Sequence, residues 1–533
     1  MKKMRYLSTA LLAVALMAAG CSSNTTPVNN DSASSDKPAE QSSEPTTGGT
    51  LNIAYEGQPN TLDTTVTTAG ATKDIGRPIY EALLTLNGNW EVTPQLAESY
   101  EVSEDGKVYT FKLRKGVKFH NGKEMTADDV VASMIKWTEN SAMNQTVLKG
   151  AEWTKVDDYT VQLSVESASA LIPFVLADQN QMAAIMPKEV AEAAGPTGAE
   201  EYIGTGPFKF VEWKRDQYIR MEKFADYQPA PGSASGLAGE KQALVDEIYW
   251  HFVPDESTRN AGLISGQYDV VVGVSHDTVE QIENTPGMAL DIYPYGFQML
   301  VFNKKQGLFT DVKARHAVNY AIDKEMILRS SFGDERFYTK EPSLFRKEQT
   351  DWYSDAGKEM YEAKDPEKAK QLLQEAGYNG EEVVILVSRD YAYQYNAAVA
   401  VQQMLEQVGV KAKLDVYDWG TLLERRKDPA AWNIFFTGWD TSVIPHQYYF
   451  LSSQANWPGW TNSPEIDQLL VDIQNAPNQE EAKKLYEKLQ QTFWEYLPII
   501  NIGNYYKING MSEKVKGFRD FIGPVVWNVS VEK

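Results

Sequence analysis

A short run late in the chain places aromatic and acidic side chains directly after a strand-like segment. Residues 434–437 read as a strand, and Gly438, Trp439 and Asp440 follow at once. Trp and Tyr combine a large apolar face with one polar group, which suits a cleft that grips varied organic ligands. Most rings in a protein belong to its core, yet this region is rich in them: Trp419, Trp432, Phe435, Phe436, Trp439, Tyr448, Tyr449, Phe450, Trp457 and Trp460. The chemistry that these residues indicate is the binding of an organic molecule.

Local catalytic patterns are absent from the sequence. It contains no H-E-x-x-H, no Walker loop, no G-x-S-x-G, no G-x-G-x-x-G and no EF-hand spacing. The five histidines lie far apart, so a metal cluster would need tertiary convergence: His120, His251, His276, His316 and His446. A catalytic triad dispersed along the chain would escape this search. We expect neither an enzyme nor a resident metal or cofactor.

The elements that would position residues 438–440 form a unit between residues 383 and 439. The pattern predicts a buried strand at 383–387, a helix at 396–408 and strands at 410–417 and 434–437. A strand, a helix and a strand in succession imply a right-handed parallel crossover, and hence an α/β lobe. Ligands of open α/β sheets bind beyond the carboxyl ends of strands. We therefore expect a loop at 438–440 and a ligand site in that loop.

Two further helices are indicated by their capping residues. Thr126, with Asp129 three positions later, predicts a capping box ahead of an apolar helical face. Asp365 followed by Pro366 predicts another helix start, and Gly377 is a natural residue just after its end. We expect both helices to serve structure.

Composition excludes several classes of protein. The 533 residues are enough for two to four domains, and 42% hydrophobic with 23% charged residues is typical of a globular protein. The formal net charge of −22 argues against a nucleic-acid partner, because nucleic acids attract basic surfaces. The single cysteine excludes an intrachain disulfide, a zinc site of four thiolates and a Cys-x-x-Cys redox pair.

The position of that cysteine indicates a membrane anchor. A basic start is followed by an apolar run of about 13 residues, too short to span a bilayer and typical of a secretory signal. The run ends in AAGC, which resembles a bacterial lipobox and implies a signal peptide at 1–20 and a lipid on Cys21. Residues 21–47 then form a flexible tether, since they hold eleven Ser or Thr and no aromatic residue. A plain secreted protein with a free thiol is the alternative.

Several stretches resemble, in the same order, the family 5 extracellular solute-binding proteins of ABC importers, which include oligopeptide, dipeptide and nickel binders. Residues 94–137 carry the longest match, PQLAESYEVSEDGKVYTFKLRKGVKFHNGKEMTADDVVASMIKW. The other matches are GGTLNIAYEGQPNTLD at 48, IGTGPFKFVEW at 203, DEIYWHFVPDESTRNAGLISGQYDVV at 246, DVKARHAVNYAIDKEMI at 311 and DPEKAKQLLQEAGY at 365. The resemblance covers essentially everything after the tether.

This resemblance implies a two-lobed α/β fold like that of periplasmic binding proteins (type II, cluster C), with a two-stranded hinge and an extra inserted domain. The expected boundaries are 48–91, 204–297 and 501–533 for lobe I, 92–203 for the inserted domain and 298–500 for lobe II. A ligand that touches both lobes would stabilise the closed state, which an ABC transporter permease then recognises. The resemblance also implies an extracytoplasmic monomer held at the cell membrane by its lipid.

In peptide-binding relatives the extended ligand is bound through its main chain, like an added strand. The resemblance maps Trp419 and Arg426 onto ligand-near residues, and Gly438 with Trp439 onto a Gly-Trp pair of the site. The carboxylate that meets the ligand's amino group in relatives falls at Ser442 here, and Asp440 is the neighbouring acid that could replace it. The run that contains Arg426 is also consistent with a solvated turn.

Three more residues complete the predicted site. Phe436 stands where some oligopeptide binders have Arg, and Tyr55 with Glu56 match a ligand-near region but also suit a strand end. Asn501, near Pro498, is expected to mark the return to lobe I. A short peptide with a free amino terminus is the leading hypothesis for the solute. A sugar derivative, an opine or a metal chelate is the second hypothesis, and a secreted peptide hydrolase is a distant third.

Overall fold

The computed structural model describes residues 46–141 and 147–533. The predicted signal peptide, Cys21 and nearly all of the predicted tether lie outside these residues. Across the two described segments, no helix is long and apolar enough to cross a membrane.

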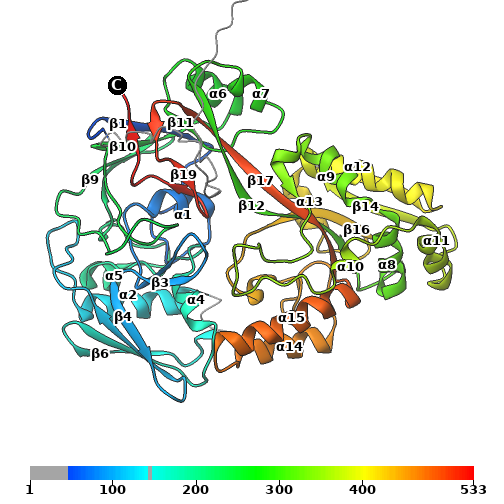
Figure 1. Cartoon of the computed structure of the whole chain (residues 1–533), viewed down its shortest axis with the longest axis horizontal. Coiled ribbons are helices and arrows are strands. Elements are labelled where there is room, and N and C mark those ends of the chain that lie inside the picture. The colour runs from blue at the N-terminus through cyan, green and yellow to red at the C-terminus, as the bar shows by residue number, and fades with distance from the viewer. Residues whose placement is uncertain (1–45, 142–146) are drawn as a thin grey trace, which may run out of the picture. The chain divides into compact units, whose positions relative to one another are not determined.

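Within the described residues, eleven strands form one mixed sheet (Figure 1). In spatial order, ten of them are β15 (Lys411–Tyr417), β14 (Glu382–Ser388), β16 (Ile434–Asp440), β12 (Met288–Phe302), β17 (Ile499–Ser512), β11 (Val270–Val271), β1 (Thr50–Tyr55), β10 (Glu247–Phe252), β9 (Tyr218–Lys223) and β8 (Phe208–Lys214). The eleventh, β13 (Tyr338–Thr339), pairs with β17. We call the half with β11, β1, β10, β9 and β8 the first lobe, and the half with β16, β14 and β15 the second lobe.

Two long antiparallel strands join these halves. Strand β12 has 15 residues and β17 has 14, and Figure 1 shows both crossing from one half to the other. The far end of β12 pairs with β16 of the second lobe, whereas the far end of β17 pairs with β11 of the first. Their ladder is irregular between Pro294 and Gly296, where Tyr295 is the extra residue. Such a bulge bends a strand locally, so the connection between the lobes has a built-in flexion point.

The second lobe confirms the predicted crossover. Strand β14, helix α12 (Ala392–Gln407) and β15 follow one another, and β14 is parallel to both β15 and β16. Gly409 has a φ of +89°, which suits its position just after the helix. Helix α12 begins four residues before the predicted start at 396, and the Tyr393 ring of this added turn packs on Phe332 and Tyr505, which lie far away in sequence.

One prediction about this lobe was wrong. Gly438, Trp439 and Asp440 were expected to form a loop, but they are the last residues of β16. The strand extends because Asp440 pairs with Gly296 and Trp439 with Phe297 of β12. A partner strand 140 residues away in sequence thus supplies backbone hydrogen bonds that local patterns cannot reveal.

Helices cover the sheet and its connections. Those of the second lobe are α8 (Val312–Ala321), α9 (Lys324–Phe332), α10 (Lys358–Tyr361), α11 (Pro366–Glu375), α13 (Trp419–Arg425), α14 (Pro464–Gln474) and α15 (Gln479–Tyr496). Those of the first lobe are α1 (Gly70–Gly76), α6 (Glu256–Ile264) and α7 (Val279–Glu283). The predicted cap of α11 is confirmed: the Asp365 carboxylate accepts from the backbone N–H groups of Glu367 and Lys368, and Gly377 has a φ of +77°.

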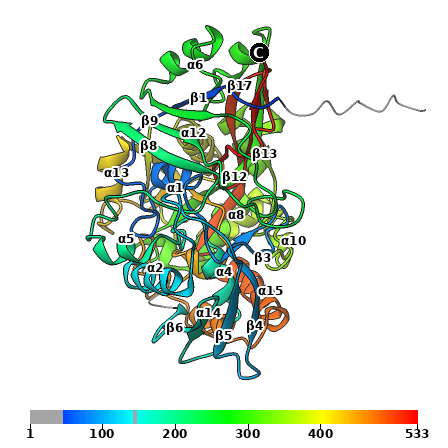
Figure 2. The same cartoon turned by 90° about the vertical axis from the view of Figure 1, so that its left-hand side faces the viewer.

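A separate small sheet occupies the segment between α1 and β8. Its strands, in order, are β4 (Ala97–Val102), β5 (Val108–Leu113), β7 (Thr160–Ser164) and β6 (Glu152–Asp157), all antiparallel to their neighbours. Helices α2 (Ala127–Asn140), α4 (Ile172–Ala177) and α5 (Lys188–Ala193) belong to the same segment. In the turned view of Figure 2 this sheet lies at the opposite end of the molecule from α6. Short strand pairs complete the fold: β2 (Leu84–Leu86) with β3 (Val92–Pro94), β18 (Val515–Lys516) with β21 (Ser530–Val531), and β19 (Arg519–Asp520) with β20 (Pro524–Val525).

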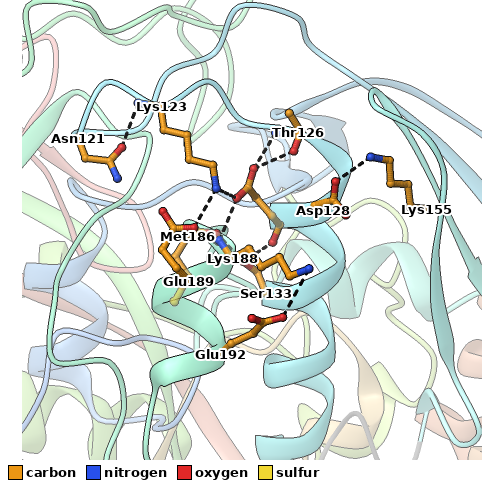
Figure 3. Close-up of polar contacts among 11 residues, drawn as sticks. Asn121, Lys123, Thr126, Asp128, Ser133, Lys155, Met186, Lys188, Glu189 and Glu192 are labelled. Atoms are coloured by element: carbon orange, nitrogen blue, oxygen red, sulfur yellow. Dashed lines mark hydrogen bonds and ion pairs between the residues drawn. The ribbon is translucent and has the colours of Figure 1, made fainter.

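The predicted capping box of α2 is confirmed and has a second task. Asp129 is fully buried and accepts from the backbone N–H of Thr126 at 2.9 Å. The same carboxylate accepts from the Lys123 ammonium at 2.6 Å and from the backbone N–H of Lys188 at 2.9 Å. Figure 3 shows Lys123, Thr126 and Lys188 gathered around this contact. The start of α2 and the packing of α5 against it therefore both depend on the Asp129 carboxylate.

A buried ion pair fixes α2 to the first lobe. The Lys136 ammonium lies 2.6 Å from a carboxylate oxygen of Asp63, and the Asp63 side chain is fully buried. Asp63 also accepts from the hydroxyl of Thr65 and from the backbone N–H of Ala199. These contacts, led by the opposing effects of burial and the Lys136 charge, leave the pKa of Asp63 below its usual value. The pair fixes the position of Trp137, the next residue along α2.

Candidate ligand-binding cleft

A cavity of about 370 Å³ lies between the two lobes. One wall lies on the first-lobe side: Thr68 belongs to that lobe, and Trp137, Val175, Asp178 and Gln181 belong to the small-sheet segment that the Lys136–Asp63 ion pair fixes to it. The other wall belongs to the second lobe and includes Gly438, Trp439, Asp440, Thr441, Ser442 and Tyr449. We call this cavity the cleft pocket. Because its walls come from both lobes, any occupant contacts both at once.

Strand pairing positions the second-lobe wall. Gly296 of β12 lies opposite Asp440, and a Cβ atom on Gly296 would be only 2.0 Å from the backbone oxygen of Trp439. Any other residue at 296 would therefore push β16 away at this point. The glycine allows the close approach that aims the end of β16 into the cleft pocket.

Aromatic packing fixes the Trp439 side chain. Its ring makes edge contacts with Tyr449 at 5.9 Å, Phe450 at 5.4 Å and Trp457 at 5.6 Å between centroids. Edge-to-face pairs of this kind stabilise by about 0.5–1.5 kcal/mol beyond the area that they bury. Tyr449 itself is 46% exposed. The pocket thus has a rigid apolar wall with one adjustable ring.

Asp440 is held by the bulged residue of β12. The Tyr295 hydroxyl donates to the Asp440 carboxylate at 2.8 Å, and the Thr441 hydroxyl donates to the Tyr295 backbone oxygen at 2.7 Å. Burial, followed by the Asp440 charge, raises the pKa of Tyr295 well above its usual value. Lys507 of β17 lies with its ammonium 3.4 Å from the centre of the Tyr295 ring, and its pKa is lowered by burial. The Asp440 carboxylate therefore lies near a cation, Lys507, that forms no ion pair within the described chain.

Asp178 is the acidic residue of the opposite wall, directly after α4. Its carboxylate accepts from the backbone N–H of Asn180 at 3.0 Å and from the side-chain amide of Gln447 at 2.7 Å. Burial raises the pKa of Asp178 to about 6, and the weaker effects of these hydrogen bonds and of the Lys73 charge oppose the rise. The direct hydrogen bonds to this partly desolvated carboxylate thus come from neutral donors.

The two lobes touch along the edge of the pocket that carries α4. The Gln447 amide of the second lobe reaches Asp178, and the backbone N–H of Ala170 donates to Ala476 at 3.1 Å. The Phe174 and Trp352 rings add an apolar contact at 5.7 Å between centroids. Separation of the lobes must break these three contacts. They therefore stabilise the closed state slightly even without a guest.

The cleft pocket brings together three of the predicted site residues, Gly438, Trp439 and Asp440, together with Ser442. Phe436 is fully buried inside β16 and lies outside the lining of the pocket. Side chains alternate along a strand, and the packing of β16 directs this one into the core. The interpretation of Phe436 as a ligand contact is therefore not supported by its position.

The remaining predicted residues lie around the pocket, not in its lining. The Tyr55 hydroxyl donates to Asp74 at 2.9 Å, which gives this ring a structural partner. Glu56 is exposed, and its charge contributes, after burial, to the raised pKa of Tyr391 on the second lobe. The Trp419 ring contacts that same Tyr391 at 5.1 Å. The charge of Glu56 on the first lobe therefore acts on Tyr391 of the second lobe, outside the lining of the pocket.

Arg426 follows α13 and is half-buried. Its guanidinium lies over the Phe435 and Trp457 rings, at 5.8 and 5.6 Å from their centres, and burial lowers its pKa. It forms no ion pair with any described residue. The solvated turn considered for this run does not describe Arg426, because aromatic rings cover it.

Sequence reasoning missed the whole first-lobe wall. Asp178, Gln181 and Thr68 have no motif around them, and Gln447 lies 269 residues from its partner Asp178. The only available signal was the apolar run of α4 that ends at an acid. Asn501 is fully buried and donates to the backbone oxygens of Glu341 and Ser343, as expected of a residue that fixes the strand crossing.

A larger cavity of about 550 Å³ is lined only by residues 322–364 of the second lobe. It is walled by salt-bridging charged side chains and does not reach the first lobe. A two-lobed clamp needs a site that both lobes share, so the cleft pocket is the better candidate. Among the residues that the structure describes, no group of three His, Cys, Asp or Glu could hold a metal ion.

A mixed sheet that two long strands divide into lobes, with a pocket between them, defines the class of two-lobed extracellular binding proteins. The model of "Bacterial extracellular solute-binding proteins, family 5 Middle" matches residues 91–461. The chain belongs to this family. The expected family membership and fold class are thereby confirmed.

Individual relatives agree with this assignment. The chain is 30% identical over 503 residues to a probable peptide ABC transporter periplasmic-binding protein, y4tO, of Sinorhizobium fredii, covering 90% of this chain and 93% of that one. DppA of Helicobacter pylori, solved with the peptide STSA, has a TM-score of 0.72 and 26% identity, covering 92% and 99%. AgaA of A. tumefaciens R10, solved with agropinic acid, has a TM-score of 0.72 and 29% identity over 91% of this chain and 99% of that one.

Proposed function

We propose that this protein captures a short peptide in the cleft pocket and delivers it to the permease of an ABC importer. The observation that carries the proposal is a pocket of about 370 Å³ whose walls come from both lobes. Relatives named as peptide-binding proteins, such as y4tO and the STSA complex of DppA, support a peptide as the guest.

The hinge converts binding into a signal. A guest that contacts Trp439 on one lobe and Asp178 on the other has more contacts when the lobes are together. Its differential affinity therefore shifts the population toward the closed state. The permease then recognises the relative position of the two lobes, and no bond in the guest is made or broken.

Each proposed contact has a distinct role. Trp439 and Tyr449 offer apolar area, and Asp440 offers a carboxylate to the amino terminus of the peptide. Glu56 and Trp419 lie outside the lining of the pocket, and we assign to them contacts with the rest of an extended peptide. Arg426 is assigned to the support of Trp457 and Phe435, because its guanidinium lies over these two rings.

Calorimetry with di- to hexapeptides, combined with thermal unfolding, tests the proposal. A guest at a hundredfold excess over its Kd should stabilise the native protein by about 2.7 kcal/mol. Asp440→Asn should weaken binding of peptides with a free amino terminus, whereas the matched control Asp277→Asn, at an exposed position outside the pocket, should not. Absence of heat and of any stabilisation across the panel would refute a peptide guest.

A non-peptide solute is the second candidate. Ser442 in the pocket wall provides a hydroxyl where peptide-binding relatives have a carboxylate, and AgaA shares 29% identity and was solved with agropinic acid. Mass spectrometry of the guest carried through gentle purification separates the two candidates. A recovered mixture of peptides would eliminate the non-peptide version.

The cellular setting is also a proposal. We infer that residues 1–20 are removed, that Cys21 carries a lipid and that residues 21–47 tether the body to the outer face of a cell membrane. The net charge of −22 argues against nucleic acid as a partner. Metabolic labelling with a radioactive fatty acid should mark the protein, and Cys21→Ser should abolish the label and release the protein.

The expected domain boundaries remain proposals as well. Two of them, at 297/298 and 500/501, fall inside β12 and β17, the strands that join the lobes. We also propose that the protein is a monomer. We further propose that it binds its guest without catalysing a reaction. A monomeric mass in light scattering at micromolar concentration would support the first statement. Long incubation with labelled peptides that yields no product would support the second.

A further inference from the structure

The charge of the cleft pocket is one-sided. Asp178 and Asp440 are its two ionisable carboxylates, and the residues that line it within the described chain include no Lys, Arg or His. The two carboxylates come from opposite walls of the pocket: Asp178 follows α4 of the small-sheet segment, and Asp440 ends β16 of the second lobe. Two negative charges that approach one another as the lobes close repel, and the repulsion is stronger in a partly desolvated cavity.

Cations near the pocket do not neutralise these acids by direct contact. Lys73 influences Asp178, but its closest carboxylate is Asp74, at 3.9 Å. Lys507 influences Asp440, but its ammonium stands over the Tyr295 ring. Arg346 lies behind the wall, buried, where it donates to the Thr441 hydroxyl at 3.0 Å. Neither pocket carboxylate has an ion-pair partner within the described residues.

The walls next to the carboxylates favour an organic cation. Trp439, Tyr449 and Trp137 contribute rings to the same cavity. Aromatic faces attract cations, most strongly where water is excluded. The Gln447 and Asn180 groups that donate to Asp178 are neutral, so they leave its negative charge uncompensated.

We propose that Asp178 determines guest specificity, by receiving a cationic side chain or amine of the guest opposite Asp440. Under this assignment a peptide whose first residue is basic is preferred to one whose first residue is neutral or acidic. The guest cation relieves the repulsion between the two lobes, which makes closure depend on its charge. The inference rests on the proposed function in placing the guest in the cleft pocket.

Calorimetry at pH 7.5 with three tripeptides of equal length, Lys-Ala-Ala, Ala-Ala-Ala and Glu-Ala-Ala, tests the preference. The lysyl peptide should bind at least about tenfold more tightly than the glutamyl peptide, because a charge-assisted contact is gained in one and a repulsion in the other. Asp178→Asn should raise the Kd of the lysyl peptide by about tenfold to a hundredfold and abolish the ranking. Asp178→Glu should keep the ranking, and Asp277→Asn should leave all three affinities unchanged.

A second arm uses 1,5-diaminopentane and the neutral 1,5-pentanediol as probes of thermal unfolding. If tripeptides bind without a charge preference, or if the preference survives Asp178→Asn, the inference is wrong while the proposed function stands. If no tripeptide binds but the diamine stabilises the wild type and not Asp178→Asn, the cation site stands and the peptide proposal falls. If neither probe set binds, both are refuted.

Discussion

Replacement of Asp178 by asparagine should make the guest-free protein more stable above pH 7. The side chain accepts two hydrogen bonds from neutral groups, and one carbonyl oxygen of asparagine can still accept from Gln447. Burial raises the pKa of Asp178 from 3.8 to about 6. The ionised form is therefore more costly in the folded chain than in the unfolded one.

The direction of this effect follows from the number of protons that Asp178 binds in the folded and unfolded states. In the unfolded chain Asp178 loses its proton near pH 4, whereas in the folded chain it keeps the proton until about pH 6. Between these values the folded state binds more protons, so the free energy of unfolding falls as pH rises. A pKa difference of about two, at ~1.36 kcal/mol per unit, sets an upper limit of about 3 kcal/mol. Because Asp178 lines the pocket, solvent screening lowers this limit, and we expect a gain of about 1–3 kcal/mol in the free energy of unfolding.

Urea unfolding of guest-free protein between pH 3.5 and pH 8 measures this gain. The free energy of unfolding of Asp178→Asn should match that of the wild type near pH 3.5 and exceed it increasingly up to pH 7. The Lys73 charge opposes the rise in the pKa of Asp178, and the Asp178 charge contributes, after burial, to the raised pKa of Tyr449. A constant difference across the range would refute the desolvation argument.

Three other changes follow from packing and charge. Gly296→Ala should lower stability by about 1–3 kcal/mol in thermal unfolding and weaken guest binding, because its Cβ would meet the Trp439 oxygen. Lys136→Met should cost about 3–5 kcal/mol in urea unfolding by leaving buried Asp63 unpaired, and adding Asp63→Asn should restore much of the loss. Trp439→Ala should abolish detectable guest heat in calorimetry while thermal unfolding stays cooperative; unchanged affinity would remove this ring from the site.

Local signals in the sequence were sufficient for the elements whose stability is local. The Thr126 and Asp365 caps, and the strand–helix–strand unit that ends at Tyr417, depend on residues within a few turns of one another. Capping oxygens satisfy the first free N–H groups of a helix, so their residue types and spacing identify the helix start.

The candidate site depended on partners that are distant in sequence. Trp439 and Asp440 continue β16 because β12 offers its backbone there, whereas the sequence predicted that the strand ends at residue 437. Asp178 gains its properties from burial against a segment more than 260 residues away. Phe436 and Arg426 were assigned by resemblance, and the packing of their own neighbours gives them other surroundings.

The extra residue in the β12 ladder has a consequence for how this protein can evolve. Tyr295 is the bulged residue of the joining strands, and the same residue holds the Asp440 carboxylate by one hydrogen bond and the neighbouring Thr441 hydroxyl by another. The bulge between the lobes and the carboxylate in the pocket are thus one structural unit. Mutations that change the flexibility of the strand connection at Tyr295 would therefore also change guest specificity. Mutations that change guest specificity at Asp440 would in turn change the flexibility of that connection.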